Sequence, residues 1–250
     1  MKKRQLTNKG QVAIFIIIGI VLIAVITLII FVLSNKTKDN GQDYSDYLSD
    51  EAYNQIQNCV ERSTTTALYF NFLQGGYYQT SKPSLYYEPI EIPFYWKEGN
   101  SYFPSINILK NELSLFVEKN IGSCLGEYDS KEITVDVIIL EDSFLFKFKI
   151  PISVQGGEKT VEFVDFENSI NLDFNEKYQF INEFLEYQEK NKDYFPLSYL
   201  TSLAYEHNFK FEILEIDENV KVVSIILDSI DERGPLVYNF AVGYKNETEI

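Results

Sequence analysis

The sequence predicts an α+β protein in which an N-terminal transmembrane helix precedes an extracytoplasmic head with amphipathic helices and an antiparallel sheet. Three observations lead to this prediction. An apolar run near the N-terminus is long enough to cross a bilayer, helical spacing of apolar residues recurs later, and blocks of short alternating segments lie between the helical stretches. We therefore expect a basic leader at residues 1–10, a transmembrane helix at 11–34, a linker at 35–43 and one head domain at 44–250.

The apolar run extends from Val12 to Leu33 and is interrupted only by Gly19 and Thr27. As a helix, its 22 residues cover about 33 Å, whereas the hydrocarbon core of a bilayer is about 30 Å thick. A secretory signal peptide has a shorter apolar region followed by small residues, and this segment lacks that pattern. The run therefore predicts a single span that is retained in the mature protein.

Charge is distributed very unevenly along the chain. Residues 1–38 contain six Lys or Arg and no acidic residue, whereas the remaining 16 basic and all 37 acidic residues follow, which gives that part a formal charge of −21. The basic residues before the span place the N-terminus in the cytoplasm and the head outside the membrane. Because so acidic a head repels phosphates, we expect no nucleic-acid partner.

Two amphipathic helices open the head, and each carries one cysteine. The first covers residues 44–74 and ends at Gly75-Gly76, whereas the second begins after Ser105 and ends near Gly126. Cys59 and Cys124 both lie in the part expected outside the membrane, where disulfides persist. We expect them to pair and to stabilise the fold by about 4 kcal/mol. Two buried free thiols are the alternative.

Between these helices, residues 75–104 contain four prolines and nine aromatic residues. The prolines exclude a helix over most of the segment, so the sequence predicts a long aromatic loop. Such a loop either packs its rings over the core, which is the favoured interpretation, or offers them to a glycan or protein partner. In the binding alternative, the contributing residues are Tyr77, Tyr78, Tyr86, Tyr87, Tyr95 and Trp96.

The remainder of the head alternates between strand and helix patterns. Short connections within each strand block predict antiparallel pairing, and the helices separate the two blocks. The expected elements are a hairpin over residues 131–141 and 143–154, a strand over 159–168, helices over 174–191 and after Pro196, and strands over 209–216, 220–229 and 236–245.

No combination of residues predicts catalysis, a cofactor or a metal site. The segment Gly122-Ser123-Cys124-Leu125-Gly126 has the outline of a nucleophile elbow, but that turn follows a strand, whereas a helical pattern ends here. His207 is the only histidine, and one histidine without neighbouring cysteines does not make an ordinary zinc site. We expect it at the C-terminus of a helix, where it would interact with the helix dipole.

The junction Lys9-Gly10-Gln11, preceded by basic residues and followed by VAIFIIIGIVLIAV, resembles the class III signal peptides of archaeal type IV pilin-like proteins. The resemblance implies that a prepilin-type peptidase cuts between Gly10 and Gln11. The apolar helix would then pack with identical or related subunits in a filament. Two features depart from that family: Phe15 stands where many pilins carry glutamate, and archaeal filament subunits commonly have all-β heads. The chain otherwise looks like single-span archaeal surface proteins of uncharacterised function.

Together these features predict a non-enzymatic cell-surface protein that is anchored in the lipid bilayer by one span. By the resemblance, one form of such a protein is a pilin-like filament subunit. The alternative is an anchored monomer whose aromatic loop at residues 75–104 binds a glycan or protein partner. An extracytoplasmic hydrolase is the weakest alternative, because no pair of nucleophile and base stands out.

Overall fold

The computed structural model describes residues 50–80, 83–128, 132–156 and 159–245 of the chain. The predicted leader, transmembrane helix and linker, at residues 1–43, lie outside this part. Within it, no helix is both long and apolar enough to cross a bilayer. The α+β class is confirmed, because helices and two sheets are both present.

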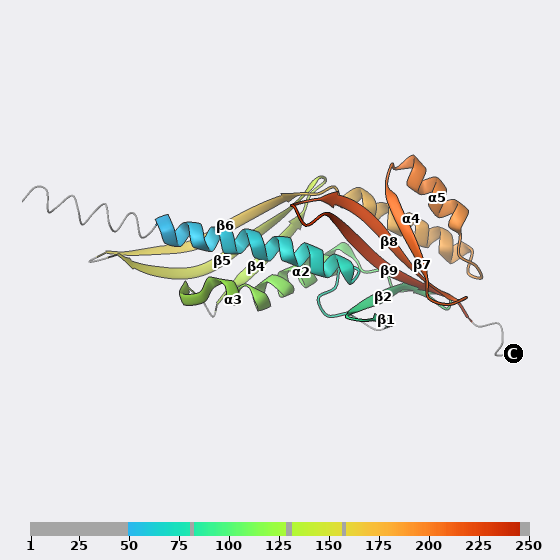
Figure 1. Cartoon of the computed structure of the whole chain (residues 1–250), viewed down its shortest axis with the longest axis horizontal. Coiled ribbons are helices and arrows are strands. Elements are labelled where there is room, and N and C mark those ends of the chain that lie inside the picture. The colour runs from blue at the N-terminus through green and yellow to red at the C-terminus, as the bar shows by residue number, and fades with distance from the viewer. Residues whose placement is uncertain (1–49, 81–82, 129–131, 157–158, 246–250) are drawn as a thin grey trace, which may run out of the picture. The chain divides into compact units, whose positions relative to one another are not determined.

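The described elements follow one another as shown in Figure 1. Residues 50–73 are helical, and we call this segment the long helix. The other helices are α2 (Ile106–Asn120), α3 (Gly122–Leu125), α4 (Asn175–Lys190) and α5 (Leu197–Glu206), with a 3-10 turn at Gly126–Tyr128. The strands are β1 (Ser84–Tyr87), β2 (Ile90–Lys97), β3 (Asn100–Ser101), β4 (Thr134–Ile139), β5 (Ser143–Gly156), β6 (Lys159–Asn171), β7 (Lys210–Glu215), β8 (Val220–Ser229) and β9 (Pro235–Gly243).

The chain divides into two compact units. The smaller one comprises Met1–Ala52 and Ser153–Val161, so its described part is limited to residues 50–52 and the adjoining ends of β5 and β6. The larger one comprises Tyr53–Ile152 and Glu162–Ile250. The core and the groove discussed below belong to the larger unit.

One of the two sheets is mixed, which corrects the prediction of an antiparallel sheet. Its strand order is β1-β2-β9-β8-β7, with β3 paired to β2, and the other sheet has the order β4-β5-β6. The pairs β1–β2, β8–β9, β7–β8 and β4–β5 are antiparallel, whereas β2 and β9 are parallel. Short connections between strands predict that they pair antiparallel. Most of the head separates β2 from β9 in the sequence, so local sequence patterns do not indicate whether these two strands are parallel or antiparallel.

The prediction of an aromatic loop over residues 75–104 is wrong, because β1, β2 and β3 lie within it. The prolines exclude a helix there but not a strand. Pro93 lies opposite Ser84 of β1, and the pairing of β2 with β9 begins only at Phe94. A proline at this point removes no hydrogen bond from the parallel ladder, which is where strands tolerate it.

The helix ends agree closely with the sequence patterns. The long helix ends before Gly75-Gly76, where the Gly76 N–H donates to the Asn71 carbonyl at 2.7 Å, and both glycines have positive φ. The second predicted helix is divided at Ile121 into α2 and α3, and Gly126 follows α3 as predicted. Ser105 occupies the N-cap position of α2, but its side chain makes no capping hydrogen bond.

The long helix packs against elements of both sheets in the larger unit. On β6, Asn168 Nδ2 donates to Thr64 Oγ1 at 2.7 Å, and on α2 the Phe116 ring lies 5.2 Å from that of Phe70. Near its C-terminus, the Phe72 ring contacts three rings from separate elements, namely Phe144 of β5, Phe174 before α4 and Tyr238 of β9. The end of the long helix is therefore the centre of the core.

Candidate functional site

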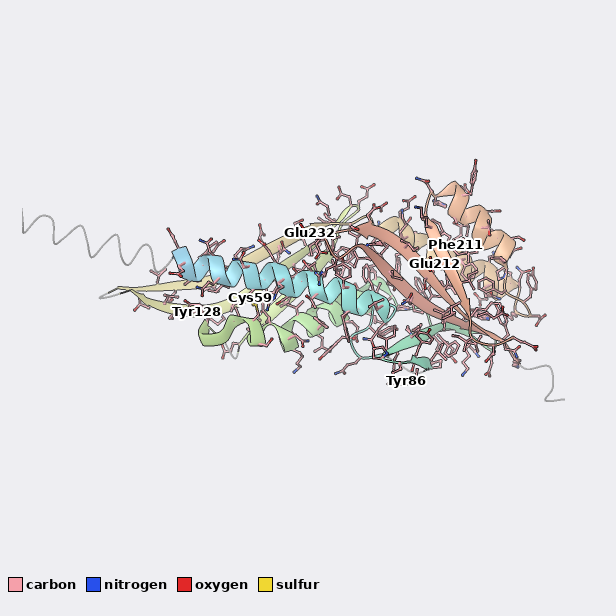
Figure 2. All side chains as sticks on the ribbon, in the orientation of Figure 1. Cys59, Tyr86, Tyr128, Phe211, Glu212 and Glu232 are labelled. Carbon is pink, nitrogen blue, oxygen red and sulfur yellow. A yellow bond between two sulfur atoms is a disulfide. The ribbon has the colours of Figure 1, made fainter. Side chains whose placement is uncertain are left out.

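The six aromatic residues predicted for a binding surface do not form one. Tyr77, Tyr95 and Trp96 are buried in the core, with exposed fractions of 6%, 0% and 1%, so packing accounts for them. Tyr78 is half-buried beside the Phe70 and Phe116 rings. Figure 2 shows Tyr86 pointing away from the ribbon on β1, where it is 68% exposed, and its neighbour Tyr87 is 47% exposed. Only these two rings remain available at the surface.

The two cysteines come together as the sequence analysis expects. Cys59 of the long helix and Cys124 of α3 form a disulfide, with their Cα atoms 5.7 Å apart (Figure 2). Cys124 therefore carries no free thiol in this structure, and it lies in a helix rather than after a strand. This arrangement contradicts the outline of a nucleophile elbow.

His207 caps the C-terminal end of α5, as predicted. Its Nδ1 lies 3.3 Å from Glu176 Oε1 on α4, and its ring lies 6.4 Å from the Phe180 ring. Within the described residues, no group of three His, Cys, Asp or Glu side chains is arranged to hold a metal ion. The contacts of His207 are those of a residue that joins two helices.

A different site was not predicted from the sequence. A groove of about 530 Å³ lies between the long helix and the turn that joins β8 to β9. We call it the arginine groove, because Arg62 and Arg233 are the only arginines that follow Arg4 in the chain, and both line it. The other lining residues are Asn58, Glu61, Thr65 and Thr66 from the long helix and Asp231 from the turn.

The turn holds Arg233 in a fixed position. Its backbone N–H and Nε donate to the Asp231 carboxylate at 2.9 and 2.7 Å, and Nη2 pairs with the same carboxylate at 2.6 Å. The guanidinium also lies 4.3 Å from the centre of the Tyr69 ring, whose hydroxyl donates toward Asp231 and the Gly234 carbonyl. These hydrogen bonds from Arg233 lower the pKa of Asp231 to about 2, so its carboxylate is ionised at neutral pH. Figure 2 marks this turn by the exposed side chain of Glu232.

Arg62 is the less constrained of the two arginines. Its side chain is exposed, and none of the ion pairs in the described part of the chain includes it. It also lines a second hollow of about 250 Å³, together with Ser63, Thr66 and residues of α2 and α3. Arg62 therefore lies where two hollows meet, with a guanidinium that is free to bind a ligand.

A third hollow continues the polar surface on the other side of the arginine groove. It has a volume of about 410 Å³ and shares Glu61 and Thr65 with the groove. The residues that β6 and β8 add to it are mostly amides and hydroxyls, including Asn168, Asn171 and Ser229. Together the three hollows present hydrogen-bond donors and acceptors around the middle of the long helix.

The charged and polar side chains of the groove are suited to binding a polar or anionic ligand. Of the two carboxylates that line the arginine groove, Glu61 and Asp231, the second is held ionised by Arg233. An acid with so low a pKa is a poor proton donor near neutral pH. A guanidinium fork, by contrast, binds carboxylates and phosphates through two parallel hydrogen bonds.

Two signals in the sequence point to this groove after the fact. The run Arg62-Ser63-Thr64-Thr65-Thr66 places four hydroxyl residues inside a helix, although such residues disfavour helix interiors. The second signal is that a head with 16 basic residues contains only two arginines. The chain matches no protein-family model, no curated protein and no solved structure.

Proposed function

We propose that this chain is a membrane-anchored, non-enzymatic protein that displays an acidic α+β head outside the cytoplasmic membrane. The observation that carries the proposal is the apolar run from Val12 to Leu33, which contains no charged residue and lies outside the described residues. The Cys59–Cys124 disulfide supports the same placement, because such bonds persist mainly in oxidising compartments.

The test is membrane association of the full chain, expressed in cells, before and after a carbonate wash. We expect the chain to stay in the membrane and the head to be digested by protease added to intact spheroplasts. The double variant Ile20→Lys, Ile23→Asp would lose membrane retention, because charges in a bilayer core are costly. The matched variant Ile20→Leu, Ile23→Leu would keep it. A head protected from external protease would contradict the proposed topology.

A second candidate function is that of a pilin-like filament subunit. The observation that favours it is the junction Lys9-Gly10-Gln11 directly before the apolar run. Mass spectrometry of the chain from cells that contain a prepilin-type peptidase would then show Gln11 as the mature N-terminus. Gly10→Val would block the cut, and filaments seen by electron microscopy would contain the processed chain. An intact Met1–Gly10 segment would exclude this candidate without affecting the anchor.

A further inference from the structure

The arginine groove is less negatively charged than the head as a whole. The part of the chain after residue 38 has a formal charge of −21, yet the groove contains two guanidinium groups and two carboxylates, Glu61 and Asp231. Its lining is therefore neutral as a whole. A negatively charged ligand would meet less repulsion here than it would elsewhere on an acidic surface.

The charges in the groove have different roles. Asp231 neutralises Arg233 through three contacts, and this pair holds the turn in shape. Glu61 accepts a hydrogen bond from Gln57 Nε2 at 3.3 Å. Arg62 is left as the one guanidinium of the groove without an ion pair in the described residues. Arg62 is therefore the group of the groove with which a single negative charge on a ligand can pair.

The other groups of the groove are suited to hydroxyls. Asn58, Thr65 and Thr66 stand on the helical side, and the Asp231–Arg233 pair stands opposite with donors and acceptors in fixed positions. The volume of about 530 Å³ lies within the range of about 300–1,000 Å³ that is usual for small-molecule sites. All seven residues that line the groove have polar or charged side chains.

We propose that the arginine groove binds a sugar acid, that is, a hydroxylated ring with one carboxylate, such as a uronic acid unit of a surface glycan. Arg62 binds the carboxylate through its two-pronged guanidinium, and the Asp231–Arg233 pair with Asn58 and Thr65 binds ring hydroxyls. A phosphate fits less well, because its second negative charge would lie near Glu61 and Asp231 with no further unpaired cation. This site goes beyond the proposed anchoring function and does not depend on it.

The test measures binding to the full chain, purified in detergent with its disulfide intact, by saturation-transfer NMR and calorimetric titration. The probes are galacturonate, neutral galactose and inorganic phosphate. We expect galacturonate to bind at least about tenfold more tightly than galactose, because a charge-assisted hydrogen-bond pair is lost with the carboxylate. Phosphate would compete only weakly.

Variants of the groove identify the residues responsible. Arg62→Ala would weaken galacturonate binding by about tenfold or more and leave galactose binding nearly unchanged, whereas Arg62→Lys would retain part of the affinity. Lys190→Ala removes a positive charge from an exposed position at the end of α4 and would have no effect. Equal binding of galacturonate and galactose, tighter binding of phosphate, or unchanged binding by a folded Arg62→Ala variant would each overturn the inference. Circular dichroism would show that each variant is folded.

Discussion

Gly75 shows at the scale of single residues how tightly the end of the long helix fits against β2 and β9. Its φ is +57°, and an added Cβ would lie 2.6 Å from Pro93 Cγ and 2.7 Å from the Asn239 carbonyl oxygen. The Gly75 carbonyl accepts a hydrogen bond of 2.7 Å from the Tyr95 hydroxyl, which also pairs with the Tyr238 hydroxyl. A glycine is required here by both backbone conformation and space.

Substitution of Gly75 tests this fit. We expect Gly75→Ala to destabilise the head by roughly 1–3 kcal/mol more than Gly126→Ala, because only the first creates overlap with packed atoms. Gly126 is a suitable control, since its φ is +60° and no atom lies within 4 Å of an added Cβ. Denaturant unfolding of both variants measures the difference. Equal losses would mean that backbone strain alone decides the effect.

The buried pair Tyr95 and Tyr238 predicts sensitivity to alkali. Burial raises the pKa of both hydroxyls well above the ordinary value of 10.0, so the folded head holds them neutral while the unfolded chain ionises them. Their stabilising contribution is therefore complete below pH 10 and is lost as the pH rises above it. Thermal unfolding followed from neutral to strongly alkaline pH should show this fall. The double variant Tyr95→Phe, Tyr238→Phe should be less stable at neutral pH, and its stability should fall less as the pH rises. If its stability falls as steeply as that of the wild type, the two buried hydroxyls are not the cause.

At the scale of elements, side-chain contacts at the first turn of α4 join two helices. Lys177 Nζ lies 2.8 Å from Glu176 and 3.1 Å from Asp173, and Glu176 also contacts His207 at the end of α5. Hydrogen bonding by Lys177 is the main reason why the pKa of Glu176 is lowered, to about 2. The carboxylate of Glu176 is thus stabilised relative to the unfolded chain.

The expected consequence is a change in acid stability. Because the pKa of Glu176 is depressed in the folded head, its contribution is present above pH 4.5 and is lost as the pH falls toward 2. Glu176→Gln should therefore lower stability at neutral pH by less than about 1 kcal/mol, since the Glu176 side chain is 45% exposed and solvent weakens the interaction. The difference from wild type should vanish in acid. Glu189→Gln is the matched control, because Glu189 lies on the exposed face of the same helix and forms no ion pair with the described residues.

Elements with a strong local pattern of apolar residues could be predicted from the sequence. Strand pairings between segments that are distant in the sequence could not. Ile181, Phe184 and Leu185 contribute to the helical spacing of α4, and all three are buried. Residues Ile92 to Trp96 of β2 are buried, but Pro93 lies among them. In the sequence alone, a proline favours a turn over a strand. Its parallel pairing with β9 depends on contacts across most of the head.

The candidate site was even less accessible from sequence. Arg62 and Arg233 are brought to one groove only because the β8–β9 turn lies beside the long helix. The position of Arg233 depends on its contacts with Asp231 and Tyr69, and Tyr69 is distant from both in sequence. The prediction of an aromatic binding site was wrong for another reason, which is that it was based on residue type. Residue type alone does not distinguish Tyr95, which is buried, from Tyr86, which is exposed.

At the scale of the whole molecule, the disulfide closes a large part of the head into one loop. Cys59 and Cys124 are separated by 65 residues, and that loop includes the end of the long helix, the strands β1 to β3 and α2. A cross-link over such a length restricts the unfolded chain strongly, and the chain-entropy account predicts about 4 kcal/mol.

Removal of the disulfide should therefore be costly to the head. We expect Cys59→Ala, Cys124→Ala to lower the free energy of unfolding by about 2–4 kcal/mol. The comparison is made by denaturant unfolding of the full chain in detergent, with reduced wild type as the control. Reduced wild type and the double variant should be similarly destabilised. Stability equal to that of oxidised wild type would contradict the expected role of the bond.

The central position of β9 has a consequence for biosynthesis. β9 is the last strand described, yet it lies between β2 and β8 rather than at an edge. A ribosome delivers the chain from its N-terminus, so the hairpins β1–β2 and β7–β8 are complete before the strand that joins them exists. A product of premature termination between Ser229 and Pro235 therefore carries two unjoined sheet fragments with open edges, which quality-control proteases can recognise and degrade.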